Sequence, residues 1–235
     1  FDDCEINKTV CGITFGCFIA SGQTCIAGTR LLIQKSISEI FLKKLKEKMF
    51  DLRMGDPFSP ETSIGPVISK DSLLNIDKKV KEAVSEGGKV IFGGKISKEF
   101  KSGYFYEPTV LLTENSSKIA REELFGPVLT CIIFEKEDEA INLANDNKYG
   151  LAASIWTENL AKAHSVANKL ECGIIWINDH HKNDPSSPWG GFKESGIGRE
   201  NGIEAYMQYT HTKSVVTNYS RKYDDWFSDK QSRYS

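Results

Sequence analysis

The fold is most clearly encoded in residues 127–178, PVLTCIIFEKEDEAINLANDNKYGLAASIWTENLAKAHSVANKLECGIIWIN. Short apolar runs in it predict strands, and the amphipathic segments between them predict helices. The expected strands are 127–134, 150–157 and 173–178, and the expected helices are 136–147 and 159–171. Strands that alternate with helices are typical of a parallel sheet covered on both faces, so we predict a three-layer α/β fold with an open, mostly parallel sheet.

The rest of the chain continues this alternation. We expect helices at 9–20, 36–50, 69–88 and 198–211 and strands at 29–34, 89–94, 104–113 and 213–218. The second of these helices is amphipathic, with Ile37, Ile40, Phe41, Leu45 and Met49 on one face. The order helix, glycine, strand at 69–94 suggests another parallel unit, and Pro108 should lie near a strand end. Because open α/β sheets bind ligands beyond the carboxyl ends of their strands, loops 119–126 and 179–196 are the first places to look.

Composition excludes several classes of function. The 235 residues include 30 basic and 32 acidic ones, a balance that argues against nucleic acid or a membrane surface as the main partner. No apolar run approaches the roughly 20 residues that span a bilayer, and the polar start is no signal peptide. The six cysteines form no CxxC pair, so we predict reduced thiols, a cytoplasmic location and no metal site.

Cys25 has two interpretations. Gly22 and Gly28 bracket it, which allows backbone to approach a substrate closely, and a thiolate at this position could attack a carbonyl carbon. A buried, unreactive thiol is the commoner fate of a cysteine. A third hypothesis is a thiol hydrolase, in which Gln23 is an oxyanion donor and His180 or His181 is the base, with Asn183 orienting it.

Two further segments could carry chemistry. Glu122 and Glu123 could act as acid and base or bind sugar hydroxyls, although a solvated acidic turn is the simpler interpretation. The segment GIGREN fails the dinucleotide fingerprint because position 201 is Asn. Trp189, between Pro188 and Gly190, either fills the core or forms the wall of a ligand pocket.

Three stretches, in this order, resemble the NAD(P)-dependent aldehyde dehydrogenases. They are GQTCIAGTRLL at 22–32, EELFGPV at 122–128 and PWGGFKESGIGRENG at 188–202, and the similarity runs from about residue 10 to 218. The resemblance implies that Cys25 is the nucleophile, passing through a hemithioacetal and a thioester, and that its backbone N–H donates to the oxyanion. It also implies that NAD, or NADP, accepts the hydride.

The resemblance assigns further residues to the site. Glu123 is expected to bind the nicotinamide ribose and Phe125 to pack against that end of the cofactor. Thr24, Ile26 and Trp189 are expected to line the aldehyde tunnel, and Asn178 matches a recurring asparagine near the site. The identity of the aldehyde is left open, because Trp189 suits a quaternary ammonium group but would also suit aromatic or aliphatic aldehydes. Whether the acyl group passes to water or to coenzyme A is left open as well.

The departures from the family pattern matter as much. The family's general base, a glutamate in an ELGG-type segment, precedes the cysteine, as do an oxyanion asparagine and the main dinucleotide-binding lobe, and none is present here. The chain therefore resembles the C-terminal catalytic portion of a longer parent protein, inactive by itself, with a catalytic domain at 1–209. Residues 210–235 are expected to form an oligomerisation strand and a polar tail, the strand pairing with a second subunit of a dimer or tetramer. A non-catalytic scaffold with this fold is the alternative.

Overall fold

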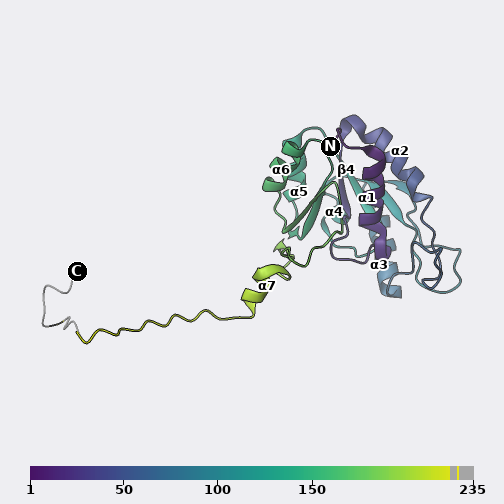
Figure 1. The fold of residues 1–235 in the computed structure, drawn as a ribbon. Helices are drawn as coiled ribbons and strands as arrows, with labels where there is room; N and C mark the ends of the chain where they lie inside the picture. The colour runs from purple at the N-terminus through teal and green to yellow at the C-terminus, as the bar shows by residue number, and fades with distance from the viewer. Residues whose placement is uncertain (223–226, 228–235) are drawn as a thin grey trace.

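The computed structural model describes residues 1–222 and 227 (Figure 1). The helices are α1 (Ile6–Phe18), α2 (Ser38–Met49), α3 (Lys70–Ser85), α4 (Lys118–Arg121), α5 (Glu137–Asn145), α6 (Leu160–Lys169) and α7 (Gly202–Gln208), with 3₁₀ turns at Ile19–Gly22 and Lys35–Ile37. The strands are β1 (Arg30–Gln34), β2 (Lys89–Phe92), β3 (Thr109–Leu112), β4 (Val128–Phe134), β5 (Tyr149–Gly150), β6 (Ala152–Ile155), β7 (Ile174–Ile177) and β8 (Phe192–Lys193). The expected alternation of strands and helices is confirmed.

The central sheet has the strand order β1-β4-β3-β2. β4 lies between two parallel neighbours, with Arg30 opposite Thr130 on one side and Thr109 opposite Val128 on the other. A second parallel pair, β6 and β7, sets Ala152 opposite Ile174, and β5 pairs with β8 in antiparallel fashion. Pro108 directly precedes β3, as expected for a residue without a backbone N–H.

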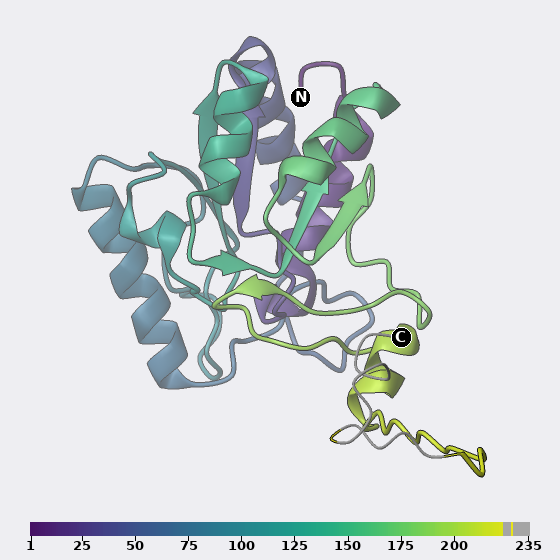
Figure 2. The ribbon, with the colours of Figure 1, turned by 90° about the vertical axis from the view of Figure 1, so that its left-hand side faces the viewer.

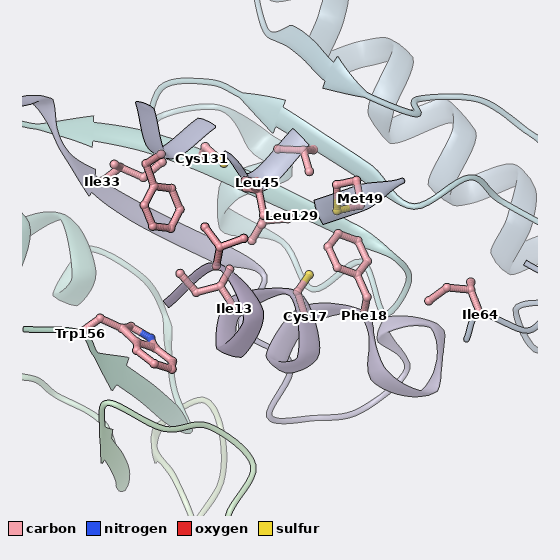
Figure 3. Close-up of a cluster of buried hydrophobic side chains, with 13 residues drawn as sticks. Ile13, Cys17, Phe18, Ile33, Leu45, Met49, Ile64, Leu129, Cys131 and Trp156 are labelled. Carbon is pink, nitrogen blue, oxygen red and sulfur yellow. The ribbon is translucent and has the colours of Figure 1, made fainter. Parts of the chain in front are cut away.

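Successive residues of the central strands enter different hydrophobic cores. Val110 and Leu129 pack in the core formed with α1 and α2, which Figure 3 shows around Leu129. Leu111 and Val128 pack in the core under α3. Because side chains alternate across a strand, these two cores lie on opposite faces of the sheet. Figure 2 shows α3 on the far side of the sheet from α1 and α2. The three-layer prediction is therefore confirmed.

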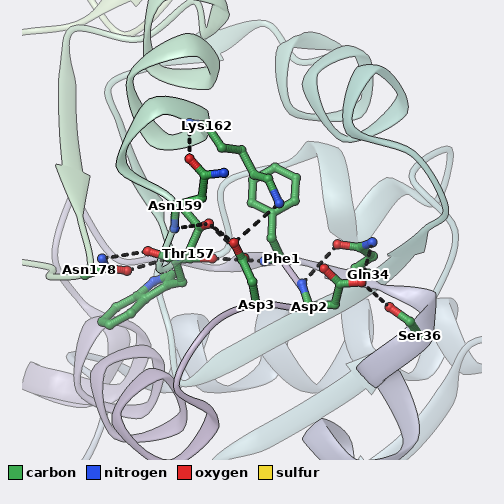
Figure 4. A network of polar contacts seen from close by, with 10 residues as sticks. Phe1, Asp2, Asp3, Gln34, Ser36, Thr157, Asn159, Lys162 and Asn178 are labelled. Atoms are coloured by element: carbon green, nitrogen blue, oxygen red, sulfur yellow. Dashed lines mark hydrogen bonds and ion pairs between the residues drawn. The ribbon is translucent and has the colours of Figure 1, made fainter.

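The N-terminal residues join the two parallel units (Figure 4). The amino group of Phe1 donates to the carbonyl of Trp156, directly after β6, at 3.0 Å, and the Asp2 N–H donates to Oε1 of Gln34, at the end of β1, at 3.0 Å. The Asp3 carboxylate accepts from Oγ1 of Thr157 at 2.7 and 2.8 Å. Burial alone opposes ionisation of Asp3, but these bonds and the charge of Lys162 outweigh it and lower its pKa.

A cavity of about 510 Å³ extends between the two parallel units. Both β1 and β6 border it along their length. Within residues 1–222, no strand pairs with the second edge of β1 or of β6. Strand β1 is accordingly only partly buried, with Ile33 as its one buried residue.

Three other expectations differ from the structure. β2 pairs with β3 in antiparallel, not parallel, fashion, because the 93–108 connection folds back as a hairpin in place of a helical crossover. Ile40 is 49% exposed, because its position in α2 lies to the side of the face that buries Phe41, Leu45 and Met49. The last helix is shorter than predicted.

The C-terminal strand is not confirmed. Residues 210–218 follow α7 as exposed chain without a hydrogen-bonded neighbouring strand, and Figure 1 shows this segment leading away from the body. A strand requires a pairing partner, and a single chain offers none here, so pairing with a second subunit stays a prediction. Residues 223–226 and 228–235 of the expected tail lie outside the described residues. Among the described helices, none is long and apolar enough to cross a membrane.

Candidate active site

The backbone leading to Cys25 has an unusual left-handed turn. Ala20, Ser21 and Gly22 have φ values of 52°, 57° and 71°. Such values are unfavourable for residues with a Cβ, so neighbouring contacts must hold them. The Ser21 hydroxyl donates to the carbonyl of Gly65 at 2.9 Å, and Oε1 of Gln23 accepts from the backbone N–H of Ile68 at 2.8 Å. The segment before the cysteine is therefore fixed by residues 65–68.

Cys25 itself lies in a tight turn. The carbonyl of Thr24 accepts from the N–H of Ala27 at 3.0 Å, which places Cys25 at the turn's first central position. Its side chain is exposed, whereas Ile26 is buried. Within the described chain, the Cys25 N–H has no hydrogen-bond acceptor. A free N–H beside its own sulfur is a donor available to an oxyanion formed there.

Two glycines bring the Glu123 loop against the cysteine segment. A Cβ placed on Gly22 would lie 2.2 Å from the carbonyl oxygen of Gly126, far closer than van der Waals contact. Phe125 precedes Gly126 with a φ of 53°. From the sequence, Gly22 was noted only as a glycine that flanks the cysteine. The left-handed conformation of Ala20 and Ser21 could not be predicted, since these residue types rarely adopt it.

Substituting Gly22 by Ala is expected to destabilise the chain by about 1–3 kcal/mol, because the new methyl group meets both a positive φ and the Gly126 carbonyl. Urea unfolding followed by circular dichroism measures the change. Gly87→Ala is the matched control, because Gly87 also has a positive φ, 102°, but open space around its Cβ position. Equal effects of the two substitutions would show that the Gly126 contact contributes nothing.

The two adjacent glutamates have different surroundings. Glu122 forms an ion pair with Lys79 at 2.6 Å, which anchors the loop to α3. Glu123 is exposed, and within the described residues its carboxylate has no hydrogen-bond or ion-pair partner. Glu123 is thus the carboxylate of the pair that is available to a ligand.

The structure brings together five of the predicted site residues. Thr24, Cys25, Ile26, Glu123 and Phe125 all line the cavity described above. These residues lie in the loops that enter β1 and β4, at the amino ends of the strands. The residues predicted for the site therefore lie at amino ends of strands of this sheet and not at carboxyl ends, because both loops precede their strands.

Asn178 and Trp189 do not line this cavity. The Asn178 amide is used by the backbone of Thr157: its Oδ1 accepts from the N–H at 3.0 Å, and its Nδ2 donates to the carbonyl at 2.8 Å. Trp189 is held in a backbone bridge to Glu200, with N···O distances of 2.6 and 2.7 Å. These contacts give both residues structural roles, and their predicted contact with substrate stays a prediction.

The buried cysteines differ from Cys25. Cys17 and Cys131 are 0% exposed, and burial raises the pKa of the Cys131 thiol to about 12 and that of Cys17 further. Burial also raises the pKa of Cys172 to about 11. All six cysteines are free, and no cluster of three or more His, Cys, Asp or Glu side chains suited to a metal occurs among the described residues. An exposed thiol on the cavity wall is the reactive candidate.

The histidines of the hydrolase hypothesis have other partners. Nε2 of His180 is 2.8 Å from the carbonyl oxygen of Ile26, and Nε2 of His181 is 3.2 Å from that of Gly16. A carbonyl only accepts, so Nε2 of each histidine carries a proton and donates it. Neither Nε2 is therefore free to take a proton from Cys25. Gln23, the proposed oxyanion donor, directs its Nε2 to Ala20 and its Oε1 to Ile68. The geometry argues against a hydrolase triad.

Comparison with known proteins decides the family. Residues 1–215 match the model of the aldehyde dehydrogenase family. The chain belongs to the aldehyde dehydrogenase family. Betaine aldehyde dehydrogenase of Bacillus subtilis is 39% identical over 231 residues, which are 97% of this chain and 47% of that enzyme. The family resemblance read from the three motifs is confirmed.

Solved structures of aldehyde dehydrogenases share the fold. Betaine aldehyde dehydrogenase of Staphylococcus aureus, in complex with NAD⁺, superposes with a TM-score of 0.92 at 41% identity, over 97% of this chain and 46% of that one. An aldehyde dehydrogenase from Bacillus cereus in complex with NAD⁺ gives a TM-score of 0.90 at 35% identity, over 94% of this chain and 45% of that one. The chain thus spans about half the length of the relatives it matches.

Proposed function

We propose that the chain is the catalytic-cysteine portion of a parent aldehyde dehydrogenase that oxidises an aldehyde to a carboxylic acid. The observation that carries this proposal is the exposed Cys25 thiol on the wall of the cavity that Glu123 and Phe125 also line. Membership of the family supports the reaction type, and the geometry of the cavity supports the choice of residues.

Cys25 performs the covalent steps. Its thiolate sulfur adds to the carbonyl carbon, and the carbonyl π electrons move to the oxygen. The resulting oxyanion accepts a hydrogen bond from the free backbone N–H of Cys25. The oxyanion re-forms the C=O bond as hydride leaves the carbon, and a thioester remains on Cys25. Water then adds to the thioester, the C–S bond breaks, and the acid and the thiol are released.

The cavity residues fit the nicotinamide end of NAD. Glu123 has two unengaged carboxylate oxygens, which suit the two hydroxyls of a ribose, and Phe125 is 43% exposed beside it, so its ring offers an apolar contact. When bound, NAD supplies the acceptor for the hydride. NAD is preferred over NADP because both solved relatives described above hold NAD⁺.

In this proposal, the parent protein supplies the general base that activates water. The relatives are about twice as long as this chain, and the family resemblance assigns the general base to a segment that is not among these 235 residues. We therefore expect the chain by itself to be inactive. The similarity to betaine aldehyde dehydrogenases makes betaine aldehyde the first substrate to assay, with a cytoplasmic location and a homo-oligomeric parent as further parts of the proposal. A non-catalytic scaffold is the alternative, and such a protein need not bind NAD.

A titration of NAD against the parent protein tests the cofactor site. Glu123→Gln is expected to weaken NAD binding about ten-fold, because an amide replaces a charge that accepts two hydroxyl hydrogen bonds. Glu122→Gln is the matched control and should leave the dissociation constant unchanged, since Glu122 is occupied by Lys79. Failure of the unaltered parent to bind NAD, or to form NADH with any aldehyde, would favour the scaffold.

A further inference from the structure

His180 lies behind the Cys25 turn, buried between three elements. Its residue exposure is 7%, and its ring packs against Trp176 of β7 with ring centroids 4.8 Å apart. Ser154 of β6 contacts Nδ1, and the carbonyl of Ile26 contacts Nε2 at 2.8 Å. The ring thus connects the β6–β7 unit with the residue that follows Cys25.

Hydrogen bonding fixes the protonation of this ring. The Ile26 carbonyl can only accept, so Nε2 carries the proton, and Nδ1 then accepts from the Ser154 hydroxyl. Both nitrogens are satisfied in the neutral form. Burial lowers the pKa of His180, against the raising effect of its bond to Ile26, and so favours the same form.

Two glycines make room for the imidazole. A Cβ on Gly16 of α1 would lie 2.7 Å from Cδ2 of His180, and a Cβ on Gly28 would lie 3.3 Å from Cε1. The two glycines also bond to each other, with the Gly28 N–H donating to the Gly16 carbonyl at 3.1 Å. The same carbonyl lies 3.2 Å from Nε2 of His181. Because glycine has no side chain, neither Gly16 nor Gly28 could take the place of the imidazole ring if it were removed.

We propose that His180 is a positioning residue, which holds the Cys25 turn at the cavity wall by its bond to the Ile26 carbonyl. This inference rests on the proposed function, in which Cys25 is the nucleophile. His180 does not act on the substrate itself. Without its N–H, the Ile26 carbonyl is buried and unpaired, and the turn relaxes toward the interior, which withdraws the Cys25 sulfur from the cavity.

The rate of alkylation of Cys25 by iodoacetamide, measured by peptide mass spectrometry on the 235-residue chain, tests this role. Cys11 is also exposed and outside the cavity, so its rate in the same sample is the internal reference. His180→Phe keeps an aromatic ring but removes the donor, and we expect the Cys25 rate relative to Cys11 to fall at least three-fold. His180→Gln restores a donor and should stay within two-fold of the unaltered chain, as should the exposed His164→Ala.

A merely structural role predicts equal rates for the Phe and Gln variants, and that result overturns the proposal. If His180→Phe does not fold, Ser154→Ala takes its place, because it releases the ring at Nδ1. The relative rate should then fall at least two-fold, and a smaller change overturns the proposal. In the parent, His180→Phe should lower kcat with the KM for NAD unchanged. Because alkylation needs neither aldehyde nor NAD, a failure of the proposed function in the Cys25→Ala assay is distinguishable from a failure of this inference.

Discussion

Cys25→Ala is expected to abolish aldehyde oxidation by the parent protein, with a loss on the order of 10⁴–10⁶-fold in kcat, the range found when one member of a catalytic triad is removed. The reason is chemical, because a methyl group cannot form the hemithioacetal from which hydride leaves. NADH formation followed by absorbance measures the loss. NAD binding should persist, since the carboxylate of Glu123 and the ring of Phe125 are unchanged.

Cys11→Ala is the control for this experiment. Cys11 is an exposed cysteine of α1 that does not line the cavity, so its loss should leave kcat unchanged. Substantial NADH formation by the Cys25→Ala parent, at a tenth of the normal rate or more, would remove Cys25 from the mechanism. A different nucleophile in the parent would then become the leading hypothesis.

Leu129→Ala is expected to destabilise the chain by about 2–5 kcal/mol, which is a large part of the total stability of a domain. Leu129 lies in β4, the strand with a parallel neighbour on each side, and it is 0% exposed in the core that includes Phe18 and Leu45. The truncated side chain leaves a cavity that these neighbours cannot fill. Chemical denaturation monitored by circular dichroism gives the change.

The matched control is Leu160→Ala, the same change at a residue that is 65% exposed on α6. Its expected cost is below about 1 kcal/mol, because little apolar area leaves the interior. Similar costs for both leucines would mean that β4 does not form the centre of the core.

Much of the fold could be predicted from the sequence, because each strand of 127–178 is a short apolar run bounded by a helical pattern. Strand direction was less accessible. The periodicity around 89–94 gives no sign that the chain folds back as a hairpin, and β2 is therefore antiparallel against expectation. The prediction that Ile40 belongs to the buried face of α2 was wrong, although its neighbour Phe41 is buried. Such an error is typical where the buried arc of a helix is narrow.

The candidate site was predictable in its residue types but not in its geometry. Cys25 and Glu123 could be named from their motifs, and the structure does bring both to one cavity. The contact between Gly22 and Gly126 joins segments about a hundred residues apart, and no local pattern encodes it. His180 was considered as a base because histidine often has that role, whereas its burial and its bond to Ile26 depend on tertiary packing.

The proposed mechanism requires that the substrate becomes covalently attached to Cys25. Acid-quenched turnover of the parent with NAD and an aldehyde, followed by peptide mass spectrometry, tests it most directly. We expect the mass of the acyl group on the peptide that contains Cys25. An acyl group on a different residue, or acid and NADH accumulating with the Cys25 peptide unmodified at every time point, would contradict it.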